Sequence, residues 1–398
     1  MTPKKRIWLI EKIRQVFSAY GFEPLETPVL EYASLLTGKY GEEAEKLMYR
    51  FEDRGGRNVA MRYDQTVPTA RVVAQYQNEL TFPYKRYQIQ PVWRADKPQK
   101  GRYREFIQCD ADIIGSASTI ADAEILAVYY AIYEAIGLNS IRIEVNDRQQ
   151  LIATVKSAGV NEDKVLSIVQ TVDKIKKISQ NELADELESK GMSADASRSL
   201  LAALKAATPS DNLQGIIEAA VVLGVPRTAL VFEPTLARGL DYYTGLIFEG
   251  SIPEYTVGSV GGGGRYDNLL NSLVGINKPA VGFGLGFDRT LEAAEQLGNL
   301  PSFNNKKVMV GVFGPEYVTD SLKLTAMLRS GGIWAECYPD AEQKLEKQIK
   351  YALKKGSTFM CIVGQDELDT STVTVKNLTK NTQESISRNA VVSFLQSS

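Results

Sequence analysis

The 398-residue sequence contains no histidine, although several would be expected by chance in a chain of this length. This absence excludes a Ser-His-Asp triad, a histidine general base and a histidine-ligated metal. Whatever chemistry the protein performs must rely on carboxylates, arginines, amides and tyrosines, together with a nucleophile that a metal or the substrate itself supplies.

Cysteines and long apolar runs are also scarce. The sequence has an odd number of cysteines, Cys109, Cys337 and Cys361, and no CxxC pair. It therefore suggests neither a disulfide framework nor a zinc site. No apolar run approaches the roughly 20 residues that cross a bilayer, and the N-terminal segment mixes charged residues among its apolar positions, unlike a secretory signal. We therefore expect a cytoplasmic protein. A formal net charge of -2 argues against a globally basic nucleic-acid binder but is compatible with local basic patches.

Sequence patterns along the chain indicate a mixed α and β protein with more than one packed unit. An apolar stripe predicts a first helix over about residues 4–20, and alternating polarity predicts strands and hairpins up to about residue 115. A capping pattern at Thr119 and Asp122 predicts the start of a helix that ends at Gly137.

Changes of pattern divide the remaining chain further. A stretch with helical spacing precedes three strand-like segments, TALVFEP, TGLIFEG and AVGFGLGF, and strands then alternate with helices towards the C-terminus. The expected divisions are the first part of a core, a helical insertion, the second part of the core, a linker and a small α/β domain, at residues 1–145, 146–226, 227–296, 297–305 and 306–398.

The densest group of polar residues is VWRADKPQKGRYREFIQCDADIIG (92–115), in which basic residues flank a predicted turn at 97–101. If the second arm is a strand, Phe106, Gln108, Asp110 and Asp112 lie on one face. A solvated charged hairpin is the alternative. However, a solvent face rarely uses a phenylalanine, and a core face does not accept two acids without partners. We therefore interpret this segment as part of a ligand site.

The segment MRYDQT (61–66) repeats this pattern more weakly, because strand alternation would place Arg62, Asp64 and Thr66 on one face. A charged strand face exposed to solvent is the competing interpretation.

The segment LARGLDYYTGLIFEG (236–250) contains Arg238 and the adjacent Tyr242 and Tyr243. Strict alternation would direct the two tyrosines to opposite faces, unless the backbone turns there.

Glycines mark two further segments. GGGGRYDNLL (261–270) matches neither a Walker loop nor a dinucleotide fingerprint, and its glycines either let backbone approach a ligand or form a flexible turn. AVGFGLGFDRTLEAAEQL (280–297) predicts a strand that leads into a helix with Arg289 in its first turn. An arginine at a helix N-terminus opposes the helix dipole, which favours a functional role for it.

Together these segments resemble the signature elements of the histidyl-tRNA synthetases, a family of class II aminoacyl-tRNA synthetases. Motif 2 corresponds to 92–115, the two histidine-specific elements to 236–250 and 261–270, and motif 3 to 280–290, and the family's pattern RGLDYYTG is unbroken. The resemblance covers nearly the whole chain. It implies an α+β fold: a class II antiparallel-sheet catalytic core with a helical insertion, plus a small α/β C-terminal anticodon-binding domain.

The resemblance implies that five residues bind ATP. Arg94 would hold the α-phosphate, Asp96 would lie near the adenine, and Arg102 would meet the outer phosphates. Phe106 and Arg289 would sandwich the base. Mg²⁺ is implied as a cofactor beside ATP, and no residue of the chain is predicted as a metal ligand.

The resemblance also implies a histidine pocket. Asp64 and Thr66 would take the α-amino group, and Gln108 the carboxylate. Asp112 and Tyr243 would bind the two imidazole nitrogens.

Two further residues complete the implied pocket. Tyr242 would lie beside the imidazole, and Arg238 would bridge the histidine carboxylate and the α-phosphate of ATP. The predicted catalytic residues are therefore Arg94, Gln108 and Arg238.

The implied activity is ATP-dependent ligation of L-histidine to tRNA(His) through a histidyl-adenylate. The implied protein is a homodimer paired through motif 1, near residues 27–32, without a membrane partner. Because the substrate's carboxylate is the nucleophile and is already ionised, this reaction needs no histidine in the enzyme. The alternative is a non-catalytic, synthetase-like regulatory subunit of ATP phosphoribosyltransferase. Such a subunit typically lacks the anticodon-binding domain and the arginine and tyrosine elements, which are present here.

Overall fold

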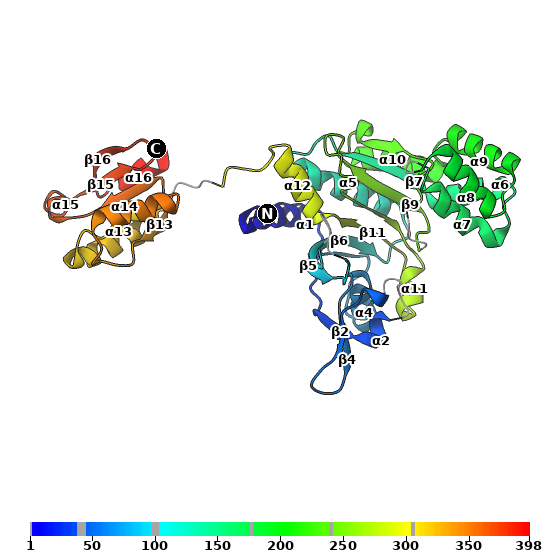
Figure 1. Cartoon of the computed structure of the whole chain (residues 1–398), viewed down its shortest axis with the longest axis horizontal. Coiled ribbons are helices and arrows are strands. Elements are labelled where there is room, and N and C mark those ends of the chain that lie inside the picture. Colours follow the sequence, from blue (N-terminus) through cyan, green and yellow to red (C-terminus); the bar gives the residue numbers. More distant parts are fainter. Residues whose placement is uncertain (1, 38–44, 98–102, 176–177, 239–241, 304–306) are drawn as a thin grey trace. The chain divides into compact units, whose positions relative to one another are not determined.

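The computed structural model describes residues 2–37, 45–97, 103–175, 178–238, 242–303 and 307–398. The chain forms two compact units, Met1–Leu300 and Pro301–Ser398. Each unit has its own sheet (Figure 1). Each also has its own cluster of buried apolar side chains.

The first unit is built on an eight-stranded sheet in the order β1-β5-β6-β11-β10-β9-β7-β8. Neighbours from β5 to β7 pair antiparallel, and the two outer pairs, β1 with β5 and β7 with β8, are parallel. The expected antiparallel core is therefore confirmed. The strands are β1 (Glu23–Pro24), β5 (Tyr84–Trp93), β6 (Glu105–Ile114), β7 (Arg142–Asp147), β8 (Leu230–Phe232), β9 (Leu246–Ser251), β10 (Gly261–Arg265) and β11 (Ala280–Leu285).

Helices cover one face of this sheet. One buried apolar cluster contains Phe17, Tyr129 and Leu291 from three of these helices, together with Phe248 and Phe283 of the sheet. This layer keeps the aromatic side chains of β9 and β11 away from water and leaves the opposite face available for a site. The helices are α1 (Pro3–Ala19), α5 (Thr119–Ala135), α10 (Asp211–Val222) and α12 (Phe287–Gln296).

The start of α5 differs from the predicted capping pattern. Ser118 is the N-cap, and its hydroxyl accepts a hydrogen bond from the backbone N–H of Ile120 at 3.3 Å. Asp122 is buried and instead accepts hydrogen bonds from Arg265, with Nε–Oδ1 at 2.9 Å and Nη2–Oδ2 at 2.8 Å. The prediction that Thr119 and Asp122 cap this helix was wrong, because a distant arginine binds the carboxylate.

A second correction concerns residues 66–75, where strands and hairpins were expected. Thr66–Gln75 form helix α4, which buries Val67, Ala70 and Val73 at helical spacing. Asp64 Oδ1 accepts hydrogen bonds from the backbone N–H groups of Thr66 and Val67, at 3.0 and 3.4 Å. The acid thus stabilises the start of a helix, and strand alternation ends before it.

Smaller elements pack on the remaining side of the first unit. Helix α4 and α11 (Leu269–Val274) share an apolar cluster with Tyr84, Ile114 and Tyr266. A three-stranded sheet in the order β2-β4-β3 adjoins them, formed by β2 (Leu30–Tyr32), β4 (Asn58–Met61) and β3 (Arg50–Glu52), with α2 (Ala33–Leu36).

The helices expected between residues 146 and 226 are present, and most of them form a separate cluster beside β7 and β9 (Figure 1). They are α6 (Arg148–Ser157), η1 (Glu162–Lys164), α7 (Val165–Val172), α8 (Gln180–Ser189) and α9 (Ala194–Ala206), and η2 (Arg227–Ala229) follows α10. Apolar residues of α10, such as Leu213 and Ile216, instead join the cluster beneath the eight-stranded sheet. The division at residues 146 and 226 stays a prediction.

The second unit contains a five-stranded sheet in the order β13-β12-β14-β15-β16. Strand β12 pairs parallel with β13 and β14, whereas β14, β15 and β16 pair antiparallel. The expected α/β domain at the C-terminus therefore has a mixed sheet. Its elements are β12 (Lys307–Val310), η3 (Pro315–Tyr317), α13 (Val318–Ser330), β13 (Trp334–Cys337), α14 (Leu345–Lys354), β14 (Phe359–Ile362), α15 (Gln365–Thr370), β15 (Thr372–Asn377), β16 (Thr382–Ser387) and α16 (Val391–Ser397).

Candidate active site

Glycines leave part of the eight-stranded sheet without side chains on the face opposite the helices. Gly262 of β10 lies directly across from Gly284 of β11, and Gly264 lies across from Gly282. A Cβ atom at Gly284 would lie 3.0 Å from Oδ1 of Asp110, and one at Gly264 would lie 2.8 Å from the Tyr243 ring. The four-glycine run is therefore a central strand, and its interpretation as a flexible turn was wrong. The floor of the site at these glycines therefore consists of backbone atoms only.

Two adjoining cavities open above this floor. The larger has a volume of about 630 Å³ and the smaller about 180 Å³. Four residues line both: Gln108, Arg238, Gly262 and Gly284. An elongated ligand in one cavity could therefore touch a ligand in the other.

Arg94, Asp96, Phe106 and Arg289, predicted to bind ATP, line the larger cavity. Arg94 Nε donates a hydrogen bond to the backbone oxygen of Tyr63 at 3.1 Å, and its guanidinium lies 4.4 Å from the Tyr63 ring centre and 5.2 Å from that of Phe106. The two rings hold the cation in place.

Arg289, which also lines the larger cavity, is exposed and donates from Nη1 to the backbone oxygen of Ser259 at 2.9 Å. This bond satisfies only part of the guanidinium, so its other donors can serve a ligand. Arg102 and most of the predicted turn at 97–101 lie outside the described residues.

Polar residues of β6 line the smaller cavity. Gln108, Asp110 and Asp112 project from the same face, as the alternation predicted, while Cys109 and Ala111 between them are buried in the apolar cluster. The strand thus separates the ligand face from the core by its two-residue period.

Asp112 is held by two buried groups from other elements. Arg86 of β5 forms an ion pair with its Oδ2, and the hydroxyl of Tyr266 donates a hydrogen bond to its Oδ1. Burial raises the pKa of Asp112, although Arg86 and Tyr266 act to lower it. The carboxylate therefore has a fixed orientation.

Tyr242 and Tyr243 both line the smaller cavity, with ring centres 4.7 Å apart. Strand β9 begins only at Leu246, so the alternation that would separate the tyrosines does not apply to them. The backbone turns at Tyr242, which is the exception to strict alternation that the sequence left open. Tyr243 is buried and Tyr242 half-buried.

Arg238 lies where the two cavities meet. Its Nη1 donates to the backbone oxygen of Phe248 at 2.8 Å, and its backbone N–H donates to Oδ1 of Asp173 at 2.9 Å. Its φ of 53° is in the left-handed region, which is unfavourable for a residue with a side chain. Strain of this kind is typical of positions where the direction of a side chain matters.

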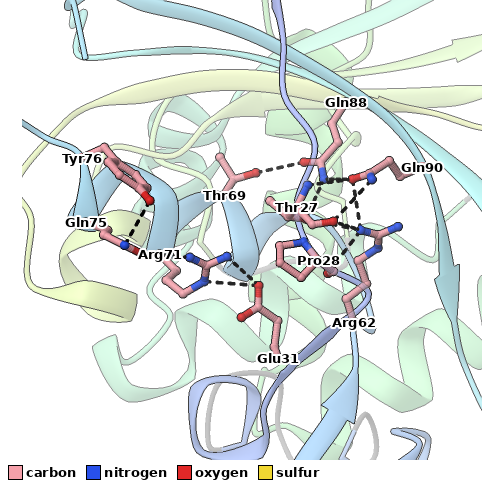
Figure 2. A network of polar contacts seen from close by, with 10 residues as sticks. All are labelled: Thr27, Pro28, Glu31, Arg62, Thr69, Arg71, Gln75, Tyr76, Gln88 and Gln90. Carbon is pink, nitrogen blue, oxygen red and sulfur yellow. Dashed lines mark hydrogen bonds and ion pairs between the residues drawn. The ribbon is translucent and has the colours of Figure 1, made fainter. Parts of the chain in front are cut away.

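Arg62, Asp64 and Thr66 do not share a strand face. Arg62 is buried and donates to the backbone oxygen of Thr27 at 2.6 Å (Figure 2). It also donates to the backbone oxygen of Pro91 at 2.8 Å, and it lines neither cavity. Thr66 lines the smaller cavity, whereas Asp64 lines neither and binds the start of α4. The shared-face prediction was wrong because α4 replaces the expected strand.

Sequence reasoning did not single out Arg86, Tyr266 or Tyr63. A hairpin that turns at 97–101 places Arg86 opposite Asp112, as the observed register of β5 and β6 has it. The position of the predicted turn could therefore have identified Arg86 as the residue opposite Asp112. Tyr63 and Tyr266 left no comparable signal, because their contacts join segments that are distant in the sequence.

Buried polar atoms without hydrogen-bond partners gather in the smaller cavity. Among the described residues, Oε1 of Gln108, Oδ1 of Asp110 and Nε of Arg238 have none. Because such atoms lose hydration without compensation, a cluster of them indicates a polar ligand. Burial raises the pKa of Asp110 to about 8, with Arg86 lowering it and Asp112 and Asp64 raising it further.

Across the six described ranges, no helix is long and apolar enough to span a membrane. The same ranges contain no group of three or more His, Cys, Asp or Glu side chains that could hold a metal ion.

Two family models match the chain. The histidyl-tRNA synthetase model matches residues 2–290, and the model of an anticodon binding domain matches residues 307–398.

Individual proteins match over nearly the same extent. The chain is 41% identical to the histidine–tRNA ligase of Rhodopirellula baltica, covering 96% of this chain and 92% of that protein. It also resembles the crystal structure of a histidyl-tRNA synthetase from a Nostoc species, with a TM-score of 0.85, 27% identity and coverage of 100% and 99%. A Bacillus halodurans ATP phosphoribosyltransferase regulatory subunit/histidyl-tRNA synthetase, at 22% identity and a TM-score of 0.75, shares the fold.

Proposed function

Because the chain belongs to the histidyl-tRNA synthetase family, we propose that its larger cavity binds ATP and its smaller cavity binds histidine. The protein is a histidine–tRNA ligase, which uses ATP to join L-histidine to tRNA(His) through a histidyl-adenylate. One observation carries the assignment of the cavities: Gln108 and Arg238 line both of them. The histidine carboxylate and the α-phosphate of ATP would meet at these two side chains.

In the ATP half of the proposed site, Arg94 binds the α-phosphate and the Phe106 ring stacks on the adenine with Arg289 on its other side. The packing of Arg94 between Tyr63 and Phe106 supports this role, because it fixes the cation before ATP binds. Asp96 would lie near the adenine, and Arg102 would meet the outer phosphates.

In the histidine half, Asp112 and Tyr243 bind the two imidazole nitrogens, with Tyr242 beside them. The fixing of Asp112 by Arg86 and Tyr266 supports this role. An amino acid without an imidazole would leave these buried groups unpaired, and such a mismatch can discriminate by roughly 10⁴-fold. Thr66, which lines the smaller cavity, would bind the α-amino group. Asp64, which lines neither cavity and holds the start of α4 through Oδ1, is proposed to add its negative charge there.

Adenylate formation by this site needs positioning and charge stabilisation, without a general base. The carboxylate of histidine is ionised at neutral pH and attacks the α-phosphorus, displacing pyrophosphate. Gln108 would orient the carboxylate, while Arg94 and Arg238 would stabilise the negative charge that develops on the phosphate oxygens. In the second step a tRNA ribose hydroxyl attacks the carbonyl carbon of the adenylate and gives its proton to a phosphate oxygen. The bond between the carbonyl carbon and the phosphate then breaks, and AMP leaves.

Mg²⁺ is proposed as the metal that accompanies ATP. Proteins commonly hold Mg²⁺ through one or two carboxylates together with substrate phosphates. The larger cavity offers single carboxylates from separate elements, Asp96, Glu249 and Asp288, which fits such a shared site. When bound, the metal would neutralise charge on the phosphates.

The proposed macromolecular partners are tRNA(His) and a second copy of the chain. The second unit, which matches an anticodon binding domain, would contact the tRNA. The segment near residues 27–32 would pair the two subunits, and Leu30 and Tyr32 are exposed there. Contacts from Arg62 to Thr27 and from Arg71 to Glu31 hold this segment against the catalytic unit (Figure 2). We propose a cytoplasmic location.

The alternative function, a non-catalytic regulatory subunit of ATP phosphoribosyltransferase, is less supported. Arg94, Arg238 and Arg289 all line the larger cavity, and residues 307–398 match an anticodon binding domain. A purely regulatory protein would need neither feature.

Histidine-dependent exchange of radioactive pyrophosphate into ATP tests the proposed function. The purified chain should catalyse exchange with histidine and much less with other amino acids. Asp112→Ala should abolish the exchange that histidine stimulates. Asp320→Ala, which removes a half-buried ion pair with Arg388 in the second unit, should leave this exchange unchanged. Absence of exchange by the unaltered protein at any histidine concentration would favour the regulatory alternative.

A further inference from the structure

Asp110 occupies the middle of the polar face of β6 and has no role in the proposed reaction. Its side chain is buried, at 6% relative exposure, and lines the smaller cavity. Oδ2 accepts a hydrogen bond from Nε2 of Gln108 at 2.7 Å. Within the part of the chain that the structure describes, Oδ1 has no hydrogen-bond partner. A buried carboxylate oxygen without a partner indicates that the cavity's ligand supplies a donor.

The charges around Asp110 indicate that this donor is a cation. Arg86 of β5 lies close enough to lower the pKa of Asp110, but it forms its ion pair with Asp112. Asp112 of β6 and Asp64 before α4 add negative charge near Asp110. The facing residue on β11 is Gly284, which contributes no side chain. An ammonium group could therefore bind Asp110 without displacing a residue.

The order of the polar side chains along β6 indicates which group of histidine supplies this cation. Gln108, Asp110 and Asp112 follow one another on one face, about 7 Å apart along the strand. In the proposed site, Gln108 binds the carboxylate of histidine and Asp112 its imidazole. The α-carbon, which carries the amino group, joins these two ends and lies between them. Asp110 is the acid at this middle position.

We propose that Asp110 is a histidine-binding residue whose Oδ1 accepts a hydrogen bond from the α-ammonium group, alongside Asp64. This inference rests on the proposed function, because it requires histidine in the smaller cavity. It explains why Gly284 must lack a side chain, since a Cβ there would lie 3.0 Å from the accepting oxygen.

Binding of the α-ammonium group beside Asp110 should change the protonation of this carboxyl group. Burial raises the pKa of Asp110 to about 8 in the empty cavity, so the carboxyl group is mostly protonated at pH 7. An adjacent ammonium favours the ionised form and lowers this pKa. Binding of histidine at pH 7 should therefore transfer a proton from Asp110 to the buffer, and this release should disappear in Asp110→Asn.

Calorimetric titration of the full chain with two ligands tests the proposal. L-histidine carries the ammonium group, and 3-(imidazol-4-yl)propionate is the same molecule without it. Asp110→Asn should weaken binding of histidine by roughly 10-fold or more, as expected for a lost hydrogen bond to a charged group. Binding of the analogue should change by less than about 2-fold on the same grounds. Asp320→Asn is the matched control and should bind both ligands as the unaltered protein does.

The outcomes separate this proposal from the proposed function. Equal weakening of both ligands, or no weakening of either, would overturn the role of Asp110 while leaving histidine activation intact. If the unaltered protein does not bind histidine, the proposed function itself fails. Proton release is measured on the unaltered protein, from the dependence of the binding enthalpy on the buffer's ionisation enthalpy. Its absence at pH 7 would overturn the proposal even if Asp110→Asn did not fold.

Discussion

Removing the guanidinium of Arg238 is expected to slow formation of histidyl-adenylate by roughly 10²- to 10³-fold. Arg238 lines both cavities, so its charge would lie beside the carboxylate that attacks and the phosphate that is attacked. The negative charge on that phosphate increases as the reaction proceeds. The loss should therefore appear mainly in kcat.

The magnitude follows from the position of the side chain. Arg238 is half-buried as a residue, and its Nη1 is already bound to the backbone oxygen of Phe248 at 2.8 Å. Nε has no partner among the described residues and is available to a ligand. A unit charge about 4 Å from another, at an effective dielectric of about 20, contributes about 4 kcal/mol. Removing one preorganised donor from comparable sites costs about 3–4 kcal/mol, which corresponds to the stated range.

Pyrophosphate exchange at saturating ATP and histidine measures this effect. Arg227→Ala provides a matched control, because Arg227 Nη1 also donates to a backbone oxygen, that of Leu230 at 3.0 Å, but lines neither cavity. Arg238→Lys keeps the charge but not the planar fork and should recover only part of the rate. If Arg238→Ala and Arg227→Ala exchange pyrophosphate at the same rate, the proposed role of Arg238 is wrong.

Four further results are expected. Asp112→Asn should raise KM for histidine far more than KM for ATP, and equal increases would mean that Asp112 is structural. Arg265→Met should lower the free energy of unfolding by about 3–5 kcal/mol in denaturant titrations, because it leaves the buried Asp122 unpaired, whereas Lys350→Met on an exposed helix should have no measurable effect. Light scattering should report a homodimer, and a monomer at working concentrations would contradict pairing through residues 27–32. Translation in a reconstituted system without histidine should yield full-length protein that charges tRNA once histidine is added, and soluble but inactive protein would refute the idea that the enzyme needs no histidine of its own.

The sequence predicted those parts of the site that depend on a local period. Alternation alone placed Phe106, Gln108, Asp110 and Asp112 on one face of β6, as observed. It succeeded because the direction of a side chain on a strand depends only on its position along that strand.

Local patterns failed where another element competed for the same side chain. Asp64 stabilises the start of α4 and Asp122 pairs with Arg265, although both had been assigned from their near neighbours in the sequence. A carboxylate binds the nearest donors in space, and the sequence does not show which donors those are.

The motifs in the sequence were enough to indicate the family, and the resemblance to that family implied the antiparallel core. The composition was enough to exclude chemistry by histidine side chains, because neither motifs nor composition require knowledge of distances. The folded structure was needed to show that the segments carrying Gln108, Arg238 and Gly284 meet at two joined cavities. It alone decided that Arg86 pairs with Asp112 while Asp110 keeps an oxygen without a partner. Burial and charge pairing depend on separations in space between groups that lie far apart along the chain, so these features arise only when the sheet forms.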